Sequence, residues 1–314
     1  MDLRPVERFN REMLGLERVY VQAVREAMGP SRLVMLEALL RDGVNSYNLP
    51  LVWRRELDQL GRIVSGIARL RADRLDEIVA VFAGQQFKLV EALTPSNSPL
   101  TGRGSLFSQA QQSTAGKRRG ILANMVESLT DWLDNLQARL QAELIRLRTG
   151  GEDEKAAADR LLAEEIADGR ASVWRHAGNT MAANSQRDLW TAATALGQTY
   201  YEAGQSQSEQ RWRKQAVAAI DERTTNCCLR VHGQIQDLDA PFHLTGTPRY
   251  ADYKQHAPFH DFCRTAEALH LEVFETVGIT TREMRDAARA ELEARERTGT
   301  RVEIHPANAV SRRG

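Results

Sequence analysis

Apolar side chains recur every three or four residues along two long stretches of this chain, and no other feature constrains its fold as strongly. The first stretch follows Pro50 and reaches Leu93, and the second extends from Ile121 to about Leu147. This spacing places apolar residues on one face of an α-helix. Pro50 suits a helix start, where its missing N–H is not needed. The stripes contain Trp53, Leu57, Leu60, Val64, Ile67, Leu75, Ile78, Phe82 and Leu89, then Leu129, Leu133, Leu136, Leu140 and Leu144.

These two stretches predict long amphipathic helices that form an antiparallel hairpin around the Pro/Ser-rich loop 94–99. Packing within the chain is the simpler interpretation of their apolar faces. A coiled-coil docking surface for another subunit is the alternative.

Weaker signals organise the rest of the chain. Residues 6–28 have a helical pattern, and Gly29-Pro30-Ser31 predicts a break, with Ser31 capping a second helix over 33–40. The polar, small-residue-rich segment 102–120 predicts a mobile or loosely helical region. Along the remaining chain we expect a helical block over 152–204, a short strand or helix end over 211–220, a charged helix over 281–297 and an extended tail over 298–314.

The expected fold class is therefore mostly α. A long helical hairpin and helical bundle precede a small α+β module that contains the cysteines and most of the histidines. We expect a helical N-terminal region over 1–150, the Cys/His module over 151–280, and a C-terminal helix with an extended tail over 281–314.

Composition narrows the functional class. Lys+Arg and Asp+Glu both number 42, so the formal net charge is zero, whereas a dedicated nucleic-acid binder usually has a basic excess. No segment approaches about 20 uncharged apolar residues, so no transmembrane helix is expected. The segment 1–5 precedes no apolar run, which argues against a signal peptide. Three cysteines are an odd number, and this favours folding in a reducing cytoplasm.

All three cysteines and four of the seven histidines fall between Cys227 and Cys263. Such clustering indicates a metal site, a disulfide or a nucleophile. Thr224 or Thr225 can cap a short helix that carries Cys228, and Gly233 suits the left-handed position after it.

A metal site is the first interpretation of this window. His260 and Cys263 are three residues apart, so one helical turn can direct both at a shared ion, with Cys228 as a third ligand. We expect Cys228 and Cys263 within metal-sharing or disulfide reach, with His260 beside them. Two interpretations stay open, namely bound zinc and a metal-free stabilising knot of buried thiols and hydrogen-bonded histidines. The fourth ligand could be Cys227, His232, His243 or His256, although adjacent Cys227 and Cys228 are expected to point different ways, leaving one merely buried.

Two enzymatic patterns involve the same residues. Cys228 and His232 are four residues apart, as a nucleophile and its base could be on one helix. A zinc deaminase needs His-x-Glu and Pro-Cys-x-x-Cys, and His260-Asp261-Phe262 with the isolated Cys263 fails that pattern.

The window resembles a module of the tailed-phage head-morphogenesis family, the minor head proteins that include the Mu F protein. That module combines a DxRT turn followed by cysteine, a C-x4-G segment and a PP-x-H-x-x-C-R-C segment. The resemblance covers about residues 165–270, with a helical lead-in from Arg175 to Arg187. The residues that carry it are Trp212, Asp221, Glu222, Arg223, Thr224, Cys228, Gly233, Pro258, His260, Cys263 and Arg264.

The chain also departs from the family pattern. Thr225 and Thr265 stand where the fullest motif has further cysteines, and Ala257 replaces the first proline. A four-cysteine zinc site is therefore impossible, and the remaining ligands are Cys228, His260 and Cys263, with Cys227 or a histidine as a substitute.

The resemblance implies a structural protein and not an enzyme. Family members associate with the portal vertex during head assembly and influence DNA delivery. We accordingly expect portal and other head-vertex proteins as partners, weak or indirect DNA contact, no membrane contact, and a location in the virion head after assembly in the host cytoplasm.

Two other functions remain open from the residues alone. One is a degenerate HNH-type metal-dependent nuclease that uses His243 and His260. Its metal-binding acid would be Asp237, Asp239, Asp252 or Asp261. The other is a cytoplasmic helical adaptor in which the Cys/His window is only a folded cap.

Overall fold

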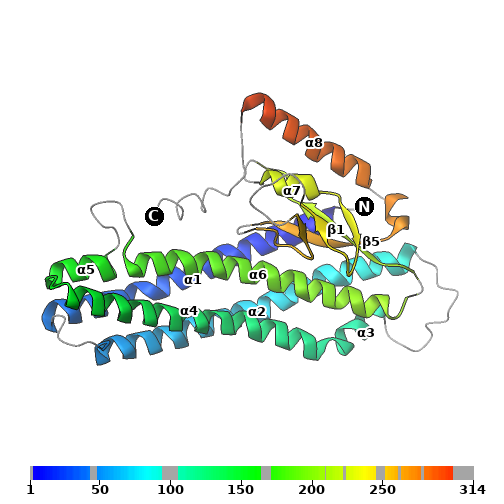
Figure 1. Cartoon of the computed structure of the whole chain (residues 1–314). Helices are drawn as coiled ribbons and strands as arrows, with labels where there is room; N and C mark the ends of the chain where they lie inside the picture. Colours follow the sequence, from blue (N-terminus) through cyan, green and yellow to red (C-terminus); the bar gives the residue numbers. More distant parts are fainter. Residues whose placement is uncertain are drawn as a thin grey trace. The chain divides into compact units, whose positions relative to one another are not determined.

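The computed structural model describes residues 3–42, 48–93, 105–163, 171–208, 210–221, 224–244, 252–260, 263–276 and 279–299. These residues are predominantly helical and include a small strand-containing module with the cysteines, which confirms the predicted fold class (Figure 1). The helices are α1 (Arg4–Asp42), α2 (Leu51–Leu93), α3 (Leu106–Ser113), α4 (Ala115–Thr149), α5 (Glu154–Leu162), α6 (Val173–Gln205), α7 (Asn226–Val231), the 3-10 helix η1 (Glu272–Thr276) and α8 (Thr281–Thr298). The strands are β1 (Arg213–Ala218), β2 (Ile235–Asp237), β3 (Phe242–His243), β4 (Tyr253–Lys254) and β5 (Thr265–His270).

The chain forms two compact units. The first contains Met1–Leu16, Asp73–Leu122 and Leu189–Arg313, and the second contains Glu17–Ala72 and Ala123–Asp188. The predicted boundaries at residues 150 and 280 stay a prediction. None of the described helices is long and apolar enough to span a membrane.

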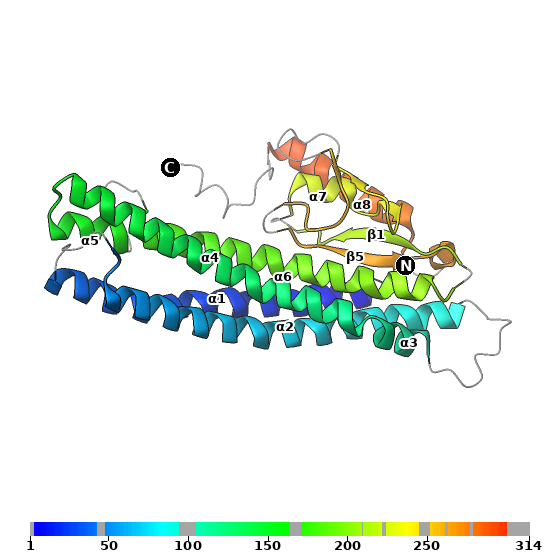
Figure 2. The same cartoon turned by 60° about the horizontal axis from the view of Figure 1, so that its bottom comes forward.

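The two long helices expected from the apolar stripes are present as α2 and α4. Figure 2 shows them side by side with opposite chain directions, and every stripe position named above except Ile67 and Leu89 is buried. The loop predicted over 94–99 lies outside the described residues. The tail predicted over 298–314 lies outside them from residue 300 onward.

The break predicted at Gly29-Pro30-Ser31 is wrong, because α1 continues through it with Pro30 inside the helix. Proline removes one helical hydrogen bond and costs about 3 kcal/mol in a helix interior. Pro30 itself is exposed, whereas Met28 and Met35 on either side are 4% and 0% exposed. Burial of this face stabilises the helix across the proline, and Ser31 is an interior residue instead of a cap.

The mobile or loosely helical segment predicted over 102–120 is also corrected from residue 105 onward. Ser105 caps α3 by accepting the Ser108 N–H over 3.2 Å, and α4 begins at Ala115 instead of Ile121. The Phe107 ring packs near Tyr200, with ring centroids 5.4 Å apart. A long-range aromatic contact and a local cap therefore order a segment whose composition is polar.

The second unit is a bundle of α1, α2, α4, α5 and α6 segments. Two buried tryptophans connect its helices through their ring N–H groups. Trp53 donates to the Met35 carbonyl over 3.0 Å, and Trp132 donates to the Ala177 carbonyl over 3.2 Å. Each bond satisfies a buried donor and fixes the register between two helices.

The first unit holds the strand module. β1, which was predicted as a strand or a helix end, is the central strand of an antiparallel sheet in the order β2-β1-β5. Arg213 pairs with Asp237 on one side and with His270 on the other. β3 and β4 form a separate two-stranded sheet. Figure 1 shows α7 next to β1, and α8 on the other side of α7.

A tryptophan anchors this sheet on the helices of its own unit. Trp212 directly precedes β1, is 1% exposed, and meets the Phe87 ring edge-on at 5.0 Å. A Cβ on Gly204 would lie 2.1 Å from the Trp212 ring. Only glycine lets α6 approach the indole this closely, so Gly204 and Trp212 position the start of the module.

Candidate functional site

The short helix predicted around Cys228 is α7, and it brings the cysteines to the module core. Thr225 occupies the N-cap, and Gly233 has the left-handed φ of +76° expected after the helix end. The Thr225 hydroxyl makes no capping hydrogen bond. Its Oγ1 lies 2.8 Å from His260 Nε2 and 3.1 Å from Cys227 Sγ, so it belongs to the site instead.

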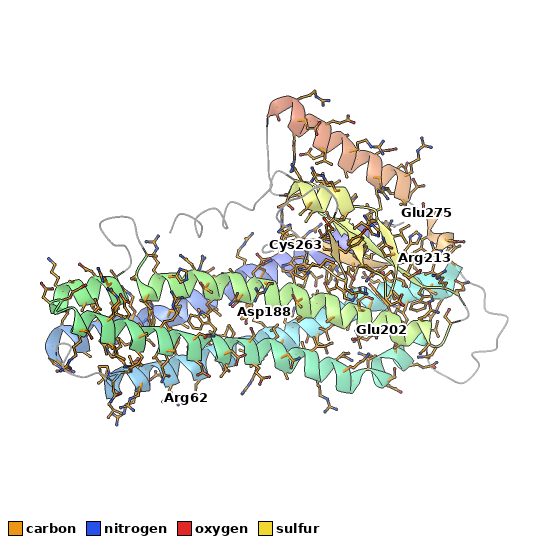
Figure 3. All side chains as sticks on the ribbon, in the orientation of Figure 1. Arg62, Asp188, Glu202, Arg213, Cys263 and Glu275 are labelled. Carbon is orange, nitrogen blue, oxygen red and sulfur yellow. The ribbon has the colours of Figure 1, made fainter. Side chains whose placement is uncertain are left out.

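Two segments 35 residues apart in sequence meet at Cys228. Its Sγ lies 3.0 Å from His260 Nε2 and 3.6 Å from Cys263 Sγ. The predicted proximity of Cys228, His260 and Cys263 is thus confirmed, and Cys263 lies in the strand module (Figure 3). The Cys263 N–H donates to the His260 carbonyl over 3.1 Å, which forms the turn expected from the three-residue spacing.

The group that could hold a metal ion consists of Cys227, Cys228 and His260. Their ligand atoms all lie within 4.8 Å of one another, and all three residues are buried. The expectation that either Cys227 or Cys228 points elsewhere is therefore wrong. Cys263 is outside this group although it contacts Cys228.

The other proposed fourth ligands occupy different places. His232 Nδ1 accepts the Ala218 N–H over 3.1 Å, and burial lowers the pKa of His232 to about 4. His232 is therefore neutral and hydrogen-bonded to β1. It does not act as the base that the predicted Cys228–His232 nucleophile pair would need. His243 is exposed and stacks edge-on against Tyr253 at 4.7 Å.

His256 belongs to a separate buried polar network. Glu267 Oε2 lies 3.1 Å from His256 Nδ1, and its Oε1 accepts the Ala257 N–H over 2.6 Å. Gln198 of α6 also donates to Glu267, over 2.6 Å. The Lys214 ammonium donates to the Gln255 carbonyl over 2.6 Å, and burial lowers its pKa. This network holds the segment that leads to His260 against α6 and β1.

An ion pair links the turn before α7 to the residue that follows Cys263. Arg264 donates to both Asp221 carboxylate oxygens, over 2.8 and 2.6 Å. The Thr224 hydroxyl accepts the Asp221 N–H over 3.2 Å. Arg295 of α8 then donates to the Thr224 carbonyl over 2.6 Å and to Asn226 Oδ1 over 3.0 Å. The turn before α7 is therefore fixed from two sides.

Sequence reasoning missed three residues of this arrangement. Thr225 was noted only as a cap and as a replacement for cysteine. Arg295 is a buried arginine in the helix that was predicted only as a charged one. Glu267 is 6% exposed, and its signal was available, since an acid in the otherwise apolar run Ala266, Ala268 and Leu269 needs a buried partner.

The chemistry available at the knot follows from its burial. Cys227, Cys228 and Cys263 are free thiols that are 1–2% exposed, and burial raises the pKa of Cys263 well above its ordinary value. A cavity of about 10 Å³ borders Cys228, His260 and Arg264. This volume is about that needed for one water molecule. This cavity has no space for an organic substrate, whereas the neighbouring group of Cys227, Cys228 and His260 could hold a metal ion.

Comparisons of this chain with protein-family models, with curated proteins and with solved structures find no match.

Proposed function

We propose that this chain is a structural minor head protein of a tailed phage. It is made in the host cytoplasm, binds the portal and other head-vertex proteins during assembly, and stays in the virion head near that vertex. Its role in DNA delivery is indirect, and it performs no catalytic turnover.

The observation that supports this proposal most is the convergence of the residues that resemble the phage module. Asp221 and Thr224 come from the first motif segment, and Arg264 comes from the second, 43 residues after Asp221. The same two segments meet again at Cys228 and His260. The two parts of the resemblance thus describe one contact network, as a single folded module requires.

The form of the site favours a structural role over the nuclease alternative. A nuclease must present its metal to a phosphate, yet Cys228 is 2% exposed and His260 is 8% exposed. His243, the second histidine of that alternative, is exposed and lies outside the one Cys/His group found among the described residues. Asp261 lies outside those residues.

We further propose zinc as the ion of the Cys227, Cys228 and His260 group. Two thiolates and an imidazole are soft and borderline donors that suit zinc and not magnesium or calcium. The donors fit, because they are buried and already within 4.8 Å of one another. Zinc would replace the hydrogen bonds that Thr225 and Cys228 make with His260. Its contribution would be to folding, since ligands contributed by two distant segments are assembled only in the native chain.

Binding to the portal tests the functional proposal. The purified portal ring of the encoding phage is immobilised, and binding of the full chain is measured with and without Mg²⁺. We expect saturable binding and no cleavage of added double-stranded DNA. A chain that ignores the ring but cleaves DNA with Mg²⁺, and loses cleavage on His260→Ala, would instead be the nuclease. A folded chain that does neither would support the cytoplasmic adaptor.

Zinc content is measured separately, on protein purified without chelator. We expect about one equivalent per chain, with loss of zinc in Cys227→Ser and Cys228→Ser. His243→Ala is the matched control, because it removes an exposed histidine of the same module. Less than about a tenth of an equivalent in the unmodified chain would contradict zinc and favour the metal-free knot.

A further inference from the structure

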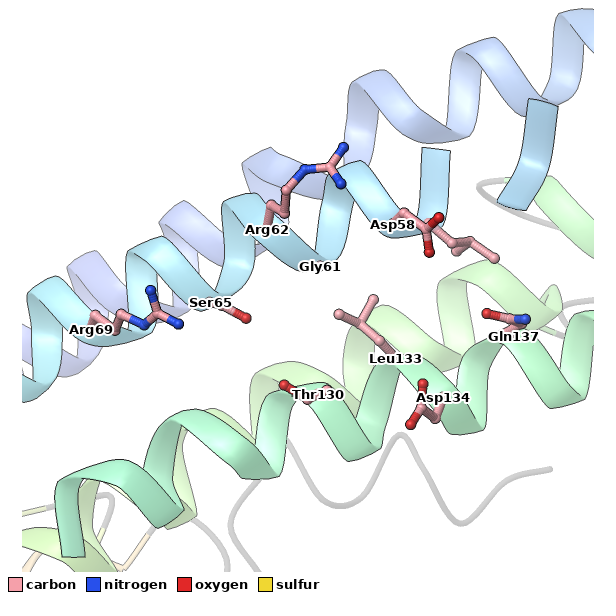
Figure 4. A pocket seen from close by; sticks show the side chains of 10 residues that line it. Asp58, Gly61, Arg62, Ser65, Arg69, Thr130, Leu133, Asp134 and Gln137 are labelled. Carbon is pink, nitrogen blue, oxygen red and sulfur yellow. The ribbon is translucent and has the colours of Figure 1, made fainter. Parts of the chain in front are cut away.

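Two hollows of the chain differ in the chemistry of the residues that border them. The groove between α2 and α4 has a volume of about 490 Å³ and is lined mainly by polar and charged side chains, with no cysteine or histidine among them (Figure 4). The cavity beside Cys228 has a volume of only about 10 Å³, yet it brings a thiol, an imidazole and a guanidinium together. A small molecule in this second cavity would lie in contact with a nucleophilic sulfur.

The wall of the cavity beside Cys228 is largely polar. Besides the thiol, its polar members are Thr224, Thr225, His260, Arg264 and Thr265. Thr265 is 1% exposed, and its hydroxyl has no hydrogen-bond partner among the described residues. Buried hydroxyl groups are normally hydrogen-bonded, so an unpaired one that borders a cavity points to a small polar ligand.

We propose that Cys228 reacts with hydrogen peroxide in this cavity and that Cys263 then forms a disulfide with it. Hydrogen peroxide is polar, little larger than water, and able to donate and accept hydrogen bonds, as the cavity wall requires. Cys228 borders the cavity, whereas Cys227 and Cys263 do not. Cys228 is therefore the sulfur that the peroxide meets, and Cys263 Sγ lies 3.6 Å from it.

The reaction consists of two balanced steps. In the first, the Cys228 sulfur attacks one peroxide oxygen and the O–O bond breaks. The thiol proton passes to the leaving oxygen, so the products are a sulfenic acid at Cys228 and one water. In the second, the Cys263 sulfur attacks the Cys228 sulfur, the S–O bond breaks, and the Cys263 proton leaves with the oxygen as a second water. Two thiols are oxidised to a disulfide while one peroxide is reduced to two waters.

The neighbours of Cys228 favour the first step. Burial alone makes a thiol inert, but His260 Nε2 lies 3.0 Å from Cys228 Sγ and Arg264 borders the same cavity. Both groups stabilise negative charge on the attacking sulfur and on the leaving oxygen. The second step requires the two sulfurs to approach each other by about 1.5 Å, which side-chain rotation can supply.

The third cysteine is a poor partner for Cys228. Cys227 is its sequence neighbour, and consecutive Cα atoms are about 3.8 Å apart, below the range of about 4.4–6.8 Å that disulfides usually span. Cys227 should therefore remain a free thiol after oxidation. It serves as an internal reference in the same protein.

Oxidation would also dismantle the proposed zinc group. Cys228 belongs to that group, and zinc binds thiolates, so a disulfide sulfur no longer serves as its ligand. A covalent bond between two segments 35 residues apart would then replace the metal as their cross-link. This consequence rests on the proposed zinc site, whereas the disulfide itself does not.

Peroxide treatment of the full chain tests the proposal. The chain is treated as purified and after metal removal, remaining thiols are alkylated in urea, and peptide mapping locates the bond. In the metal-free chain we expect a Cys228–Cys263 disulfide with Cys227 alkylated. The Cys228 thiol should be lost at least about tenfold faster in the native chain than in the chain unfolded in urea. Zinc should leave the metal-bound chain in step with the disulfide. A chain that holds no zinc but forms the bond would contradict the zinc site and support this proposal.

Variants separate the roles of the two cysteines. Cys263→Ser should accumulate a sulfenic acid at Cys228, which the 1,3-diketone dimedone traps, whereas Cys228→Ser should give no adduct at Cys263. Thr265→Val has a similar shape but no hydroxyl and should slow the loss of the Cys228 thiol about threefold to tenfold. Thr180→Val in the second unit is the matched control.

Circular dichroism establishes that each variant is folded. The comparison of native and unfolded chain needs no variant, so the proposal stays testable if Cys263→Ser does not fold. No Cys228–Cys263 disulfide in the treated native chain, a native chain that reacts no faster than the unfolded one, or a dimedone adduct at Cys263 instead of Cys228 would each overturn the proposal.

Discussion

Acidification should weaken the Cys/His module through one histidine. Burial lowers the pKa of His232 to about 4 from the ordinary 6.5, because the enclosed ring cannot be solvated when charged. The unfolded chain keeps the ordinary value and therefore takes up a proton first as the pH falls. The stability associated with neutral His232 is fully present above pH 6.5 and is lost progressively toward pH 4.

The magnitude follows from the difference between the two pKa values. A difference of about 2.5 units corresponds to about 3 kcal/mol in total, of which about 2 kcal/mol is lost by pH 5. His232→Asn is the informative variant, because its side-chain oxygen can still accept the Ala218 N–H but does not titrate. Between pH 7 and pH 5, the unmodified module should therefore lose about 2 kcal/mol more than the variant does.

Thiol labelling under native conditions measures this difference in the module alone. All three cysteines of the chain are buried there, so a labelling reagent reaches them only when the module opens. Chelator is present at both pH values, and His243→Asn serves as the exposed control. Burial also lowers the pKa of His270, but His270 is common to all three proteins. An equal pH dependence for the unmodified chain and His232→Asn would refute the reasoning.

Three further substitutions have expected outcomes. Gly204→Ala should lower the free energy of unfolding by about 1–3 kcal/mol or more, because its Cβ overpacks against Trp212. Gly197→Ala has nothing within 4 Å of its Cβ and should instead stabilise α6 by up to about 1 kcal/mol; equal effects in thermal unfolding would contradict the packing argument. Pro30→Ala should raise the free energy of unfolding, measured in urea, by up to about 3 kcal/mol. A lower free energy of unfolding would show that the proline is required. Arg295→Met removes four hydrogen bonds and should make α8 susceptible to limited proteolysis, and unchanged protection would argue against its docking role.

The long helices could be predicted from the sequence because their information is local and repeated. Each apolar residue of a stripe indicates the same buried face of its helix, so many weak sequence signals agree. The break at Pro30 was predicted from a single residue by a rule that counts one lost hydrogen bond. That rule cannot include the burial of Met28 and Met35, which depends on helices far away in sequence. Phe107 shows the same limit, since its partner Tyr200 lies 93 positions later.

The sequence predicted which residues form the candidate site better than it predicted how their side chains are oriented. Clustering identified Cys228, His260 and Cys263, and the structure brings them together. The place of Cys227 was misjudged because adjacent side chains diverge on an extended or long helical segment, whereas the start of the short helix α7 directs both sulfurs to His260. The separate Glu267 network could not be assigned from spacing, since its members come from α6, β1, β5 and a loop.

The sheet order β2-β1-β5 determines at what point of synthesis the first unit can complete its fold. β1 ends 47 residues before the start of β5, the strand with which it forms its longest pairing, and Gln86 precedes by 183 residues the Leu269 N–H that it accepts. Until then Phe87 and Tyr201 have no cover from β1 and β5. The first unit thus becomes complete only after β5 has been synthesised, and a chain that stops before β5 presents an apolar surface that quality-control proteases recognise.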